Sequence, residues 1–172
     1  RYRLNDYSDK VLDYCYEHRL PLAMEILDID FFKQYNDNYG HQQGDECIIA
    51  IADELKKMED RQTFCARYGG DEFIIIYAGA SAEEVYAKAA ALRQNIMDLK
   101  LEHLYSKALP IVTISQGISY GVPEEGNRSW DFLHTADMLL YQVKKRSRND
   151  ICIADIRGQE LDLSSKQEKV EP

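Results

Sequence analysis

Several common sequence signatures are missing from this 172-residue chain. The four cysteines form no CxxC pair and the four histidines lack metal-site spacing, so we expect reduced thiols and no structural zinc. No apolar run approaches the roughly 18 residues of a transmembrane helix, and the N-terminus lacks a signal-peptide pattern. These absences predict a cytoplasmic location and no membrane segment in this part of the protein.

An excess of positive charge is also missing. The net charge of −9 argues against a nucleic-acid-binding surface. A polyanionic small substrate would therefore need metal ions and a local basic patch. Such a patch lies near the C-terminal end and comprises Lys144, Lys145, Arg146 and Arg148.

The usual motifs of phosphate and zinc chemistry are absent as well, since the sequence has no Walker loop, no GxGxxG and no HExxH. Length and composition fit one globular domain with a sizeable core. Because the chain starts at Arg1 rather than Met, we expect a fragment of a longer protein, whose remaining part could be membrane-anchored.

Hydrophobic periodicity predicts an α+β domain over residues 1–156, followed by a polar tail, 157–172, that we expect to be mobile or extra to the fold. The expected helices are 1–19, 31–38, one after Gly44-Asp45, one opened by a capping box at Ser81, and 130–145. The expected strands are 22–29, 63–68, 73–77, 111–120 and 151–154, with Gly117 a bulge or a close-approach point. This order predicts a ferredoxin-like antiparallel sheet with a βαββαβ core and helices packed on it.

The stretch RYGGDEF, Arg67 to Phe73, connects two β-favouring runs. A Gly-Gly pair at this place predicts a hairpin with a type I′ turn, in which both Gly69 and Gly70 have positive φ. Two carboxylates, Asp71 and Glu72, follow the turn directly. A carboxylate pair beside a backbone without Cβ atoms suits a metal-bound phosphate, whereas the alternative is a solvated hairpin tip.

A second acidic stretch, Asp28-Ile29-Asp30, ends the first strand. Asp28 and Asp30 share one side of that strand, and each is also a candidate helix N-cap. In a split βαβ sheet, Asp28 would lie beside Asp71 and Glu72. Carboxylates crowded in this way raise one another's pKa unless a cation lies among them, and paired Mg²⁺ ions drive phosphoryl and nucleotidyl displacement.

Three segments together resemble the GGDEF-domain diguanylate cyclases: LDIDFFKQYNDNYGHQQGDE (27–46), RYGGDEF, and ADMLLYQVKKRSRN (136–149). The resemblance covers about residues 1–155 and implies a palm-like fold akin to that of nucleotide polymerases and adenylyl cyclases. It implies condensation of two GTP into cyclic di-GMP and two pyrophosphates between two facing domains, a homodimer. It also implies Mg²⁺ or Mn²⁺, two ions per half-site, and an upstream sensor or dimerisation domain.

The resemblance assigns metal and catalytic roles at matching positions. Asp28 and Asp71 would bind the metals, assisted by the Ile29 carbonyl. Glu72 would lie near the attacking 3′-hydroxyl, as base or as second metal ligand. The glycine pair 69–70 would let the hairpin lie against the nucleotide.

Substrate-binding roles follow in the same way. Asn36 and Asp45 would read guanine, because a carboxylate accepts from N1–H and the 2-amino group together; Asn36 could alternatively cap a helix. The phosphates would be bound by backbone N–H groups of Phe31 and Phe32 and by the charges of Lys33, Lys144 and Arg148. Lys144 and Arg148 could instead form a solvated helix end. Arg67 would support the cluster.

The sequence departs from the family pattern at the inhibitory RxxD site, where it has Asp60-Arg61-Gln62-Thr63. We therefore expect that micromolar cyclic di-GMP does not inhibit in the usual way. Three functions stay open at this point: a cyclase, a non-enzymatic GTP-binding module that regulates a neighbouring domain, and a cyclase with relaxed base choice. The intact GGDEF motif favours the first, and Asp45 argues against the third.

Overall fold

A computed structural model describes residues 2–161 and 163 of the chain and contains one sheet flanked by helices. The strands are β1 (Leu22–Ile29), β2 (Thr63–Arg67), β3 (Glu72–Ala78), β4 (Ile114–Gly121) and β5 (Ile151–Asp155). The helices are α1 (Tyr2–His18), α2 (Phe32–Tyr39), α3 (His41–Met58), α4 (Ala82–Asp98) and α5 (Ser129–Arg146).

The strand order in the sheet is β2-β3-β1-β4-β5. The first three neighbouring pairs are antiparallel and β4 pairs with β5 in parallel. The predicted α+β fold with five strands is therefore confirmed, although the sheet is mixed rather than wholly antiparallel. The central strand β1 is buried along its whole length, which its nearly continuous apolar sequence requires.

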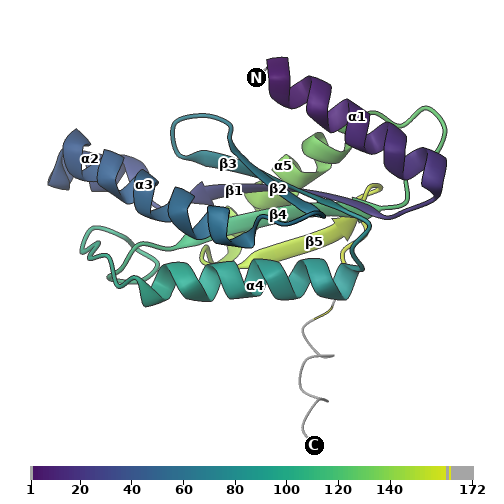
Figure 1. Cartoon of the computed structure of the whole chain (residues 1–172). Coiled ribbons are helices and arrows are strands. Elements are labelled where there is room, and N and C mark those ends of the chain that lie inside the picture. Colours follow the sequence, from purple (N-terminus) through teal and green to yellow (C-terminus); the bar gives the residue numbers. More distant parts are fainter. Residues whose placement is uncertain (1, 162, 164–172) are drawn as a thin grey trace, which may run out of the picture.

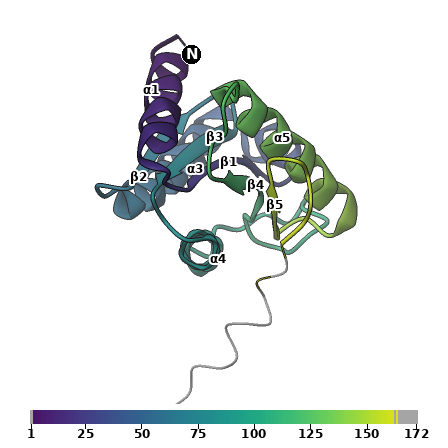
Figure 2. The ribbon, with the colours of Figure 1, turned by 90° about the vertical axis from the view of Figure 1, so that its right-hand side faces the viewer.

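Helices cover both faces of the sheet (Figures 1 and 2). Alternate residues of β1 point to opposite faces, so Leu27 packs in one core cluster with α3 and α4 while Ile26 packs in the other with α1 and α5. Figure 2 shows α1 and α5 on one side of the sheet and α4 on the other. The ends of β1 and β3 emerge between these layers, and this places the acidic residues at one edge of the core.

Of two predictions that concern glycines, the one for Gly117 is confirmed and the one for Gly44 is wrong. Gly117 is a close-approach point, as predicted, because a Cβ there would overlap the backbone of Ala136 and Leu140 in α5. Gly44 does not precede a helix as predicted: it lies inside α3, which begins at His41. Only Gly40, with φ 89°, separates α2 from α3, and the positive φ lets the chain turn within one residue.

After β5 the chain turns and runs back beside that strand, with an antiparallel bridge between Ala154 and Glu160. Leu161 N–H donates to the Ile153 carbonyl at 2.8 Å, and Leu163 is buried in the larger core cluster. Residue 162 and residues 164–172 of the predicted tail lie outside the described residues. Among the described residues, no helix is both long and apolar enough to cross a membrane.

Candidate active site

Strand pairing brings the two acidic stretches together, as the sequence predicts. Asp28 is the register partner of Glu72 in the β1–β3 pair. One residue further on, the Ile29 N–H donates to the Asp71 carbonyl at 3.3 Å. The end of β1 therefore lies against the start of β3 at one end of the sheet, and we call the cluster of Asp28, Asp71 and Glu72 the acidic corner.

The hairpin turn differs from the predicted type I′ turn, because neither Gly69 nor Gly70 has a positive φ. The turn is instead closed by Tyr68 N–H donating to the Glu72 carbonyl at 2.9 Å and by Arg67 Nη2 donating to the Gly70 carbonyl at 2.7 Å. A Cβ on Gly70 would meet no atom within 4 Å, and one on Gly69 only Glu72 Oε2 at 3.9 Å. Neither backbone conformation nor packing within the described residues requires glycine here, so the turn has open space for a ligand.

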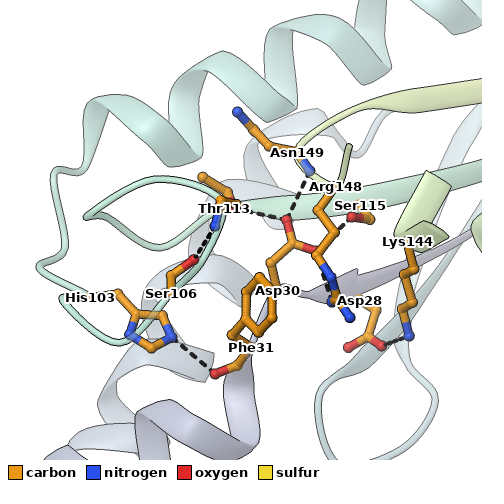
Figure 3. A network of polar contacts seen from close by, with 11 residues as sticks. Asp28, Asp30, Phe31, His103, Ser106, Thr113, Ser115, Lys144, Arg148 and Asn149 are labelled. Atoms are coloured by element: carbon orange, nitrogen blue, oxygen red, sulfur yellow. Dashed lines mark hydrogen bonds and ion pairs between the residues drawn. The ribbon is translucent and has the colours of Figure 1, made fainter. Parts of the chain in front are cut away.

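Asp28 has an unusual electrostatic setting. Its carboxyl is buried, its Oδ2 forms an ion pair with Lys144 Nζ, and its Oδ1 has no hydrogen-bond partner among the described residues (Figure 3). Burial raises the pKa of Asp28 to about 7, with a further increase from Asp71 and a partial decrease from Lys144. A buried carboxylate with an unpartnered oxygen, beside the half-buried Asp71, is a donor set that suits a divalent cation.

No group of three or more His, Cys, Asp or Glu side chains that could hold a metal occurs among the described residues. Mg²⁺ sites of nucleotide enzymes commonly use one or two carboxylates and complete their shell with water and substrate phosphates. Asp28, Asp71 and the Ile29 carbonyl fit such a site, in which the substrate itself supplies ligands.

A cavity of about 390 Å³ extends from the hairpin to α2 and α3. The predicted site residues in its lining are Phe32, Lys33, Asn36, Asp45, Arg67, Gly70 and Asp71. Asn36 Oδ1 is buried, has no hydrogen-bond partner within the part of the chain that the structure describes, and lies over Gly44, where a Cβ would overlap it. The absence of a side chain at Gly44 thus leaves room for the amide of Asn36, a residue of the cavity lining.

The connection between β1 and α2 is a strained turn. Helix α2 begins one residue later than predicted, and Phe31 takes the N-cap position with φ 54°, a left-handed conformation that is uncommon for an aromatic residue. The Arg148 guanidinium lies 4.2 Å from the centre of the Phe31 ring. The first N–H groups of a helix have no partner within it, and those of α2 lie at this turn.

Asp30 is neither a helix cap nor a cavity residue. It is 1% exposed and accepts hydrogen bonds from Thr113 Oγ1 at 2.8 Å, Ser115 Oγ at 2.6 Å and Asn149 N–H at 2.9 Å (Figure 3). Arg148 Nη1 lies 3.6 Å from Asp30 Oδ1. Asp30 therefore joins the ends of β1, β4 and α5 below the Phe31 turn.

The basic patch divides into two pairs. Lys144 and Arg148 face the acidic corner through Asp28 and Asp30. Lys145 instead lies over the Tyr141 ring, and Arg146 contacts Glu160 on an exposed surface. Within the patch, therefore, Lys144 and Arg148 contact carboxylates at the end of β1, and neither lines the cavity.

Sequence reasoning missed His103, which is fully buried in the connection between α4 and β4. Its Nε2 lies 2.9 Å from the Phe31 carbonyl oxygen. No motif or spacing in the sequence marks this histidine, because its partner lies 72 residues away.

Comparisons with known proteins agree with this geometry. The family described as "Diguanylate cyclase, GGDEF domain" matches residues 1–150. The probable diguanylate cyclase DgcC of Escherichia coli is 35% identical over 140 residues, which are 80% of this chain and 36% of that protein. This chain thus spans about a third of the length of that relative.

Two solved structures are similar in fold. One is the GGDEF domain of DgcB from Caulobacter crescentus in complex with c-di-GMP, with a TM-score of 0.79, 28% identity and coverage of 91% of this chain and 90% of that one. The other is the active GGEEF domain of a diguanylate cyclase from Vibrio cholerae, with a TM-score of 0.76, 29% identity and coverage of 89% and 95%. With its fold, its acidic corner and its motifs in agreement, the chain belongs to the diguanylate cyclase GGDEF domain family.

Proposed function

We propose that the domain condenses two GTP molecules into cyclic di-GMP and two pyrophosphates, with two copies of the domain facing one another. The observation that carries this proposal is the cavity that runs from Asn36 and Asp45 to Asp71, beside the buried Asp28. Family membership supports the same reaction.

Guanine would bind at the α2–α3 end of the cavity. Asp45 accepts from guanine N1–H and the 2-amino group, a pattern that adenine cannot supply, and Asn36 is held beside it by its contact with Gly44. The phosphates would lie at the Phe31 turn, where the first N–H groups of α2, Lys33 and Arg148 supply donors and positive charge.

Asp28, Asp71 and the Ile29 carbonyl would hold Mg²⁺ or Mn²⁺, two ions per half-site, and Glu72 would act as base or as a further ligand. A bound divalent cation neutralises developing phosphate charge in such displacements. Lys144 now pairs with Asp28 and would be free to contact a phosphate once a cation takes its place. The 3′-hydroxyl of one GTP attacks the α-phosphate of the other, a new P–O bond forms, and pyrophosphate leaves.

Each domain supplies one GTP, so two copies must meet with their sites facing. An upstream sensor or dimerisation segment in the longer protein would bring them together. The net charge of −9 on each copy opposes that encounter at low ionic strength.

The direct test is incubation of the domain at high concentration with GTP and Mg²⁺ or Mn²⁺, followed by mass spectrometry of the products. Asp71→Ala is the matched control, because it leaves the fold and the guanine pocket in place. Cyclic di-GMP from the wild type and none from the control supports the proposal. GTP binding without product, even after fusion of a coiled coil ahead of Arg1, would instead identify a non-enzymatic GTP-binding module.

A further inference from the structure

His103 makes a specific contact with the turn at which the phosphates would bind. The imidazole is fully buried, and its Nε2 lies 2.9 Å from the carbonyl oxygen of Phe31 (Figure 3). A carbonyl can only accept, so Nε2 carries the proton and donates it. The Tyr35 ring packs edge-on against the imidazole, with ring centres 5.2 Å apart, and restricts its rotation.

The segment that carries His103 is itself held in place. The His103 N–H donates to the Pro110 carbonyl at 3.0 Å, and the Val112 N–H donates to the Leu101 carbonyl at 2.8 Å. These bonds tie both ends of the loop between α4 and β4 together. The imidazole is therefore a fixed donor rather than a side chain that meets Phe31 by chance.

The Phe31 carbonyl has a second donor, since the Tyr35 N–H binds it at 3.0 Å as part of α2. In a planar trans peptide the carbonyl and the following N–H point in opposite directions. A Phe31 carbonyl that is held along α2 therefore directs the Phe32 N–H outwards from the start of the helix. The left-handed Phe31 needs such contacts, because an aromatic residue does not favour φ 54° on its own.

We propose that His103 is a positioning residue for the triphosphate of GTP: by holding the Phe31 carbonyl, it aims the N–H groups at the start of α2 towards the phosphates. This inference rests on the proposed GTP site. It assigns His103 to the phosphate subsite only, because its hydrogen bond is to the Phe31 carbonyl and the imidazole does not line the cavity that contains Asn36 and Asp45.

The test compares binding of GTP with binding of guanosine, by calorimetry at protein concentrations too low for turnover. His103→Leu removes the donor, and His103→Gln retains an N–H near the Nε2 position. Ser106→Ala is the matched control, since it removes a hydrogen bond of the same loop, Ala108 N–H to Ser106 Oγ at 3.2 Å, without a contact to Phe31. Thermal unfolding shows whether each variant is folded.

We expect His103→Leu to lower GTP affinity about tenfold, leave guanosine affinity unchanged and be largely rescued by His103→Gln. Ser106→Ala should bind GTP like the wild type. If His103→Leu does not fold, His103→Asn, whose amide is too short to reach Phe31, takes its place in the comparison. Equal losses for GTP and guanosine, or unchanged GTP affinity, would overturn the positioning role alone. A wild type that binds no GTP would overturn the proposed function and this inference together.

Discussion

At the residue scale, Asp45 is the side chain from which the account derives base selectivity. It lines the cavity of about 390 Å³ together with Asn36. We expect Asp45→Asn to weaken GTP binding about tenfold and to leave weak ATP binding unchanged, because the lost acceptor serves only guanine. Titration with each nucleotide measures this difference.

The matched control for this prediction is Asp53→Asn. Asp53 is exposed on the same helix and is absent from the cavity lining. An Asp45→Asn domain that still prefers GTP over ATP as strongly as the wild type would show that guanine is read elsewhere.

Glu25, a buried residue of the sheet, makes the free energy of unfolding depend on pH. It lies fully buried on β1, its Oε1 accepts from Tyr77 Oη–H at 2.9 Å, and its Oε2 has no partner among the described residues. Burial raises the pKa of Glu25 from 4.5 to about 8, while the Tyr77 hydrogen bond opposes the increase. Between these two values the folded state binds more protons than the unfolded state, so the free energy of unfolding contributed by Glu25 falls as pH rises.

We therefore expect Glu25→Gln to become progressively more stable than the wild type from pH 5 to pH 8, by at most roughly 1.4 kcal/mol per pH unit. Urea unfolding at several pH values measures this. Glu17→Gln, at an exposed position of α1, should show no such trend. A constant difference between Glu25→Gln and the wild type across this range would contradict the assignment of a buried neutral acid.

At the scale of elements, the packing of α2 on α3 shapes the proposed guanine pocket through Gly44. Alanine at this position would push Asn36 aside, yet it favours helix by up to about 1 kcal/mol. We expect Gly44→Ala to retain or raise the melting temperature while GTP binding falls several-fold. The effect should vanish in an Asn36→Ala background, because the two changes act on one contact. If the losses of GTP affinity caused by the two substitutions add up in the double variant, the Gly44–Asn36 contact does not explain the effect of Gly44→Ala.

The residues that lead into β2, Asp60 to Thr63, differ from the inhibitory RxxD pattern. Asp60 there pairs with Lys88 Nζ at 2.7 Å, and the same Nζ donates to Thr63 Oγ1 at 2.7 Å. We expect micromolar cyclic di-GMP to leave the initial rate unchanged, since the Arg and Asp of that pattern are both missing from their places. Initial rates with added product test this, and strong inhibition that Arg61→Ala abolishes would contradict it.

The elements themselves were largely predictable from the sequence, and their internal geometry was not. The apolar, β-favouring runs and the order of elements located the β1–β3 pair and thereby Asp28 beside Glu72. The predicted start of α3 was wrong because of Gly44. A glycine required by a tertiary contact with Asn36 looks the same in the sequence as one that precedes a helix. Asp30 and His103 gain their partners from segments more than 70 residues away, so no local pattern could predict their roles.

At the scale of the whole molecule, the proposed reaction requires two copies of the domain. Each domain carries the cavity lined by Asp45 and Asp71, whose α2–α3 end is the proposed guanine site, together with the acidic corner. A charge of −9 on each copy makes encounters rare at low salt. Turnover should consequently increase as moderate salt screens this repulsion, before higher salt weakens substrate binding.

The most direct test of the central claim is the dependence of the initial rate of cyclic di-GMP formation on protein concentration, at saturating GTP and Mg²⁺. If two domains must meet, a dilute domain should show a rate that rises with the square of its concentration. A rate that is strictly proportional to concentration, down to the most dilute sample, would mean that a single copy completes the reaction and would contradict the account.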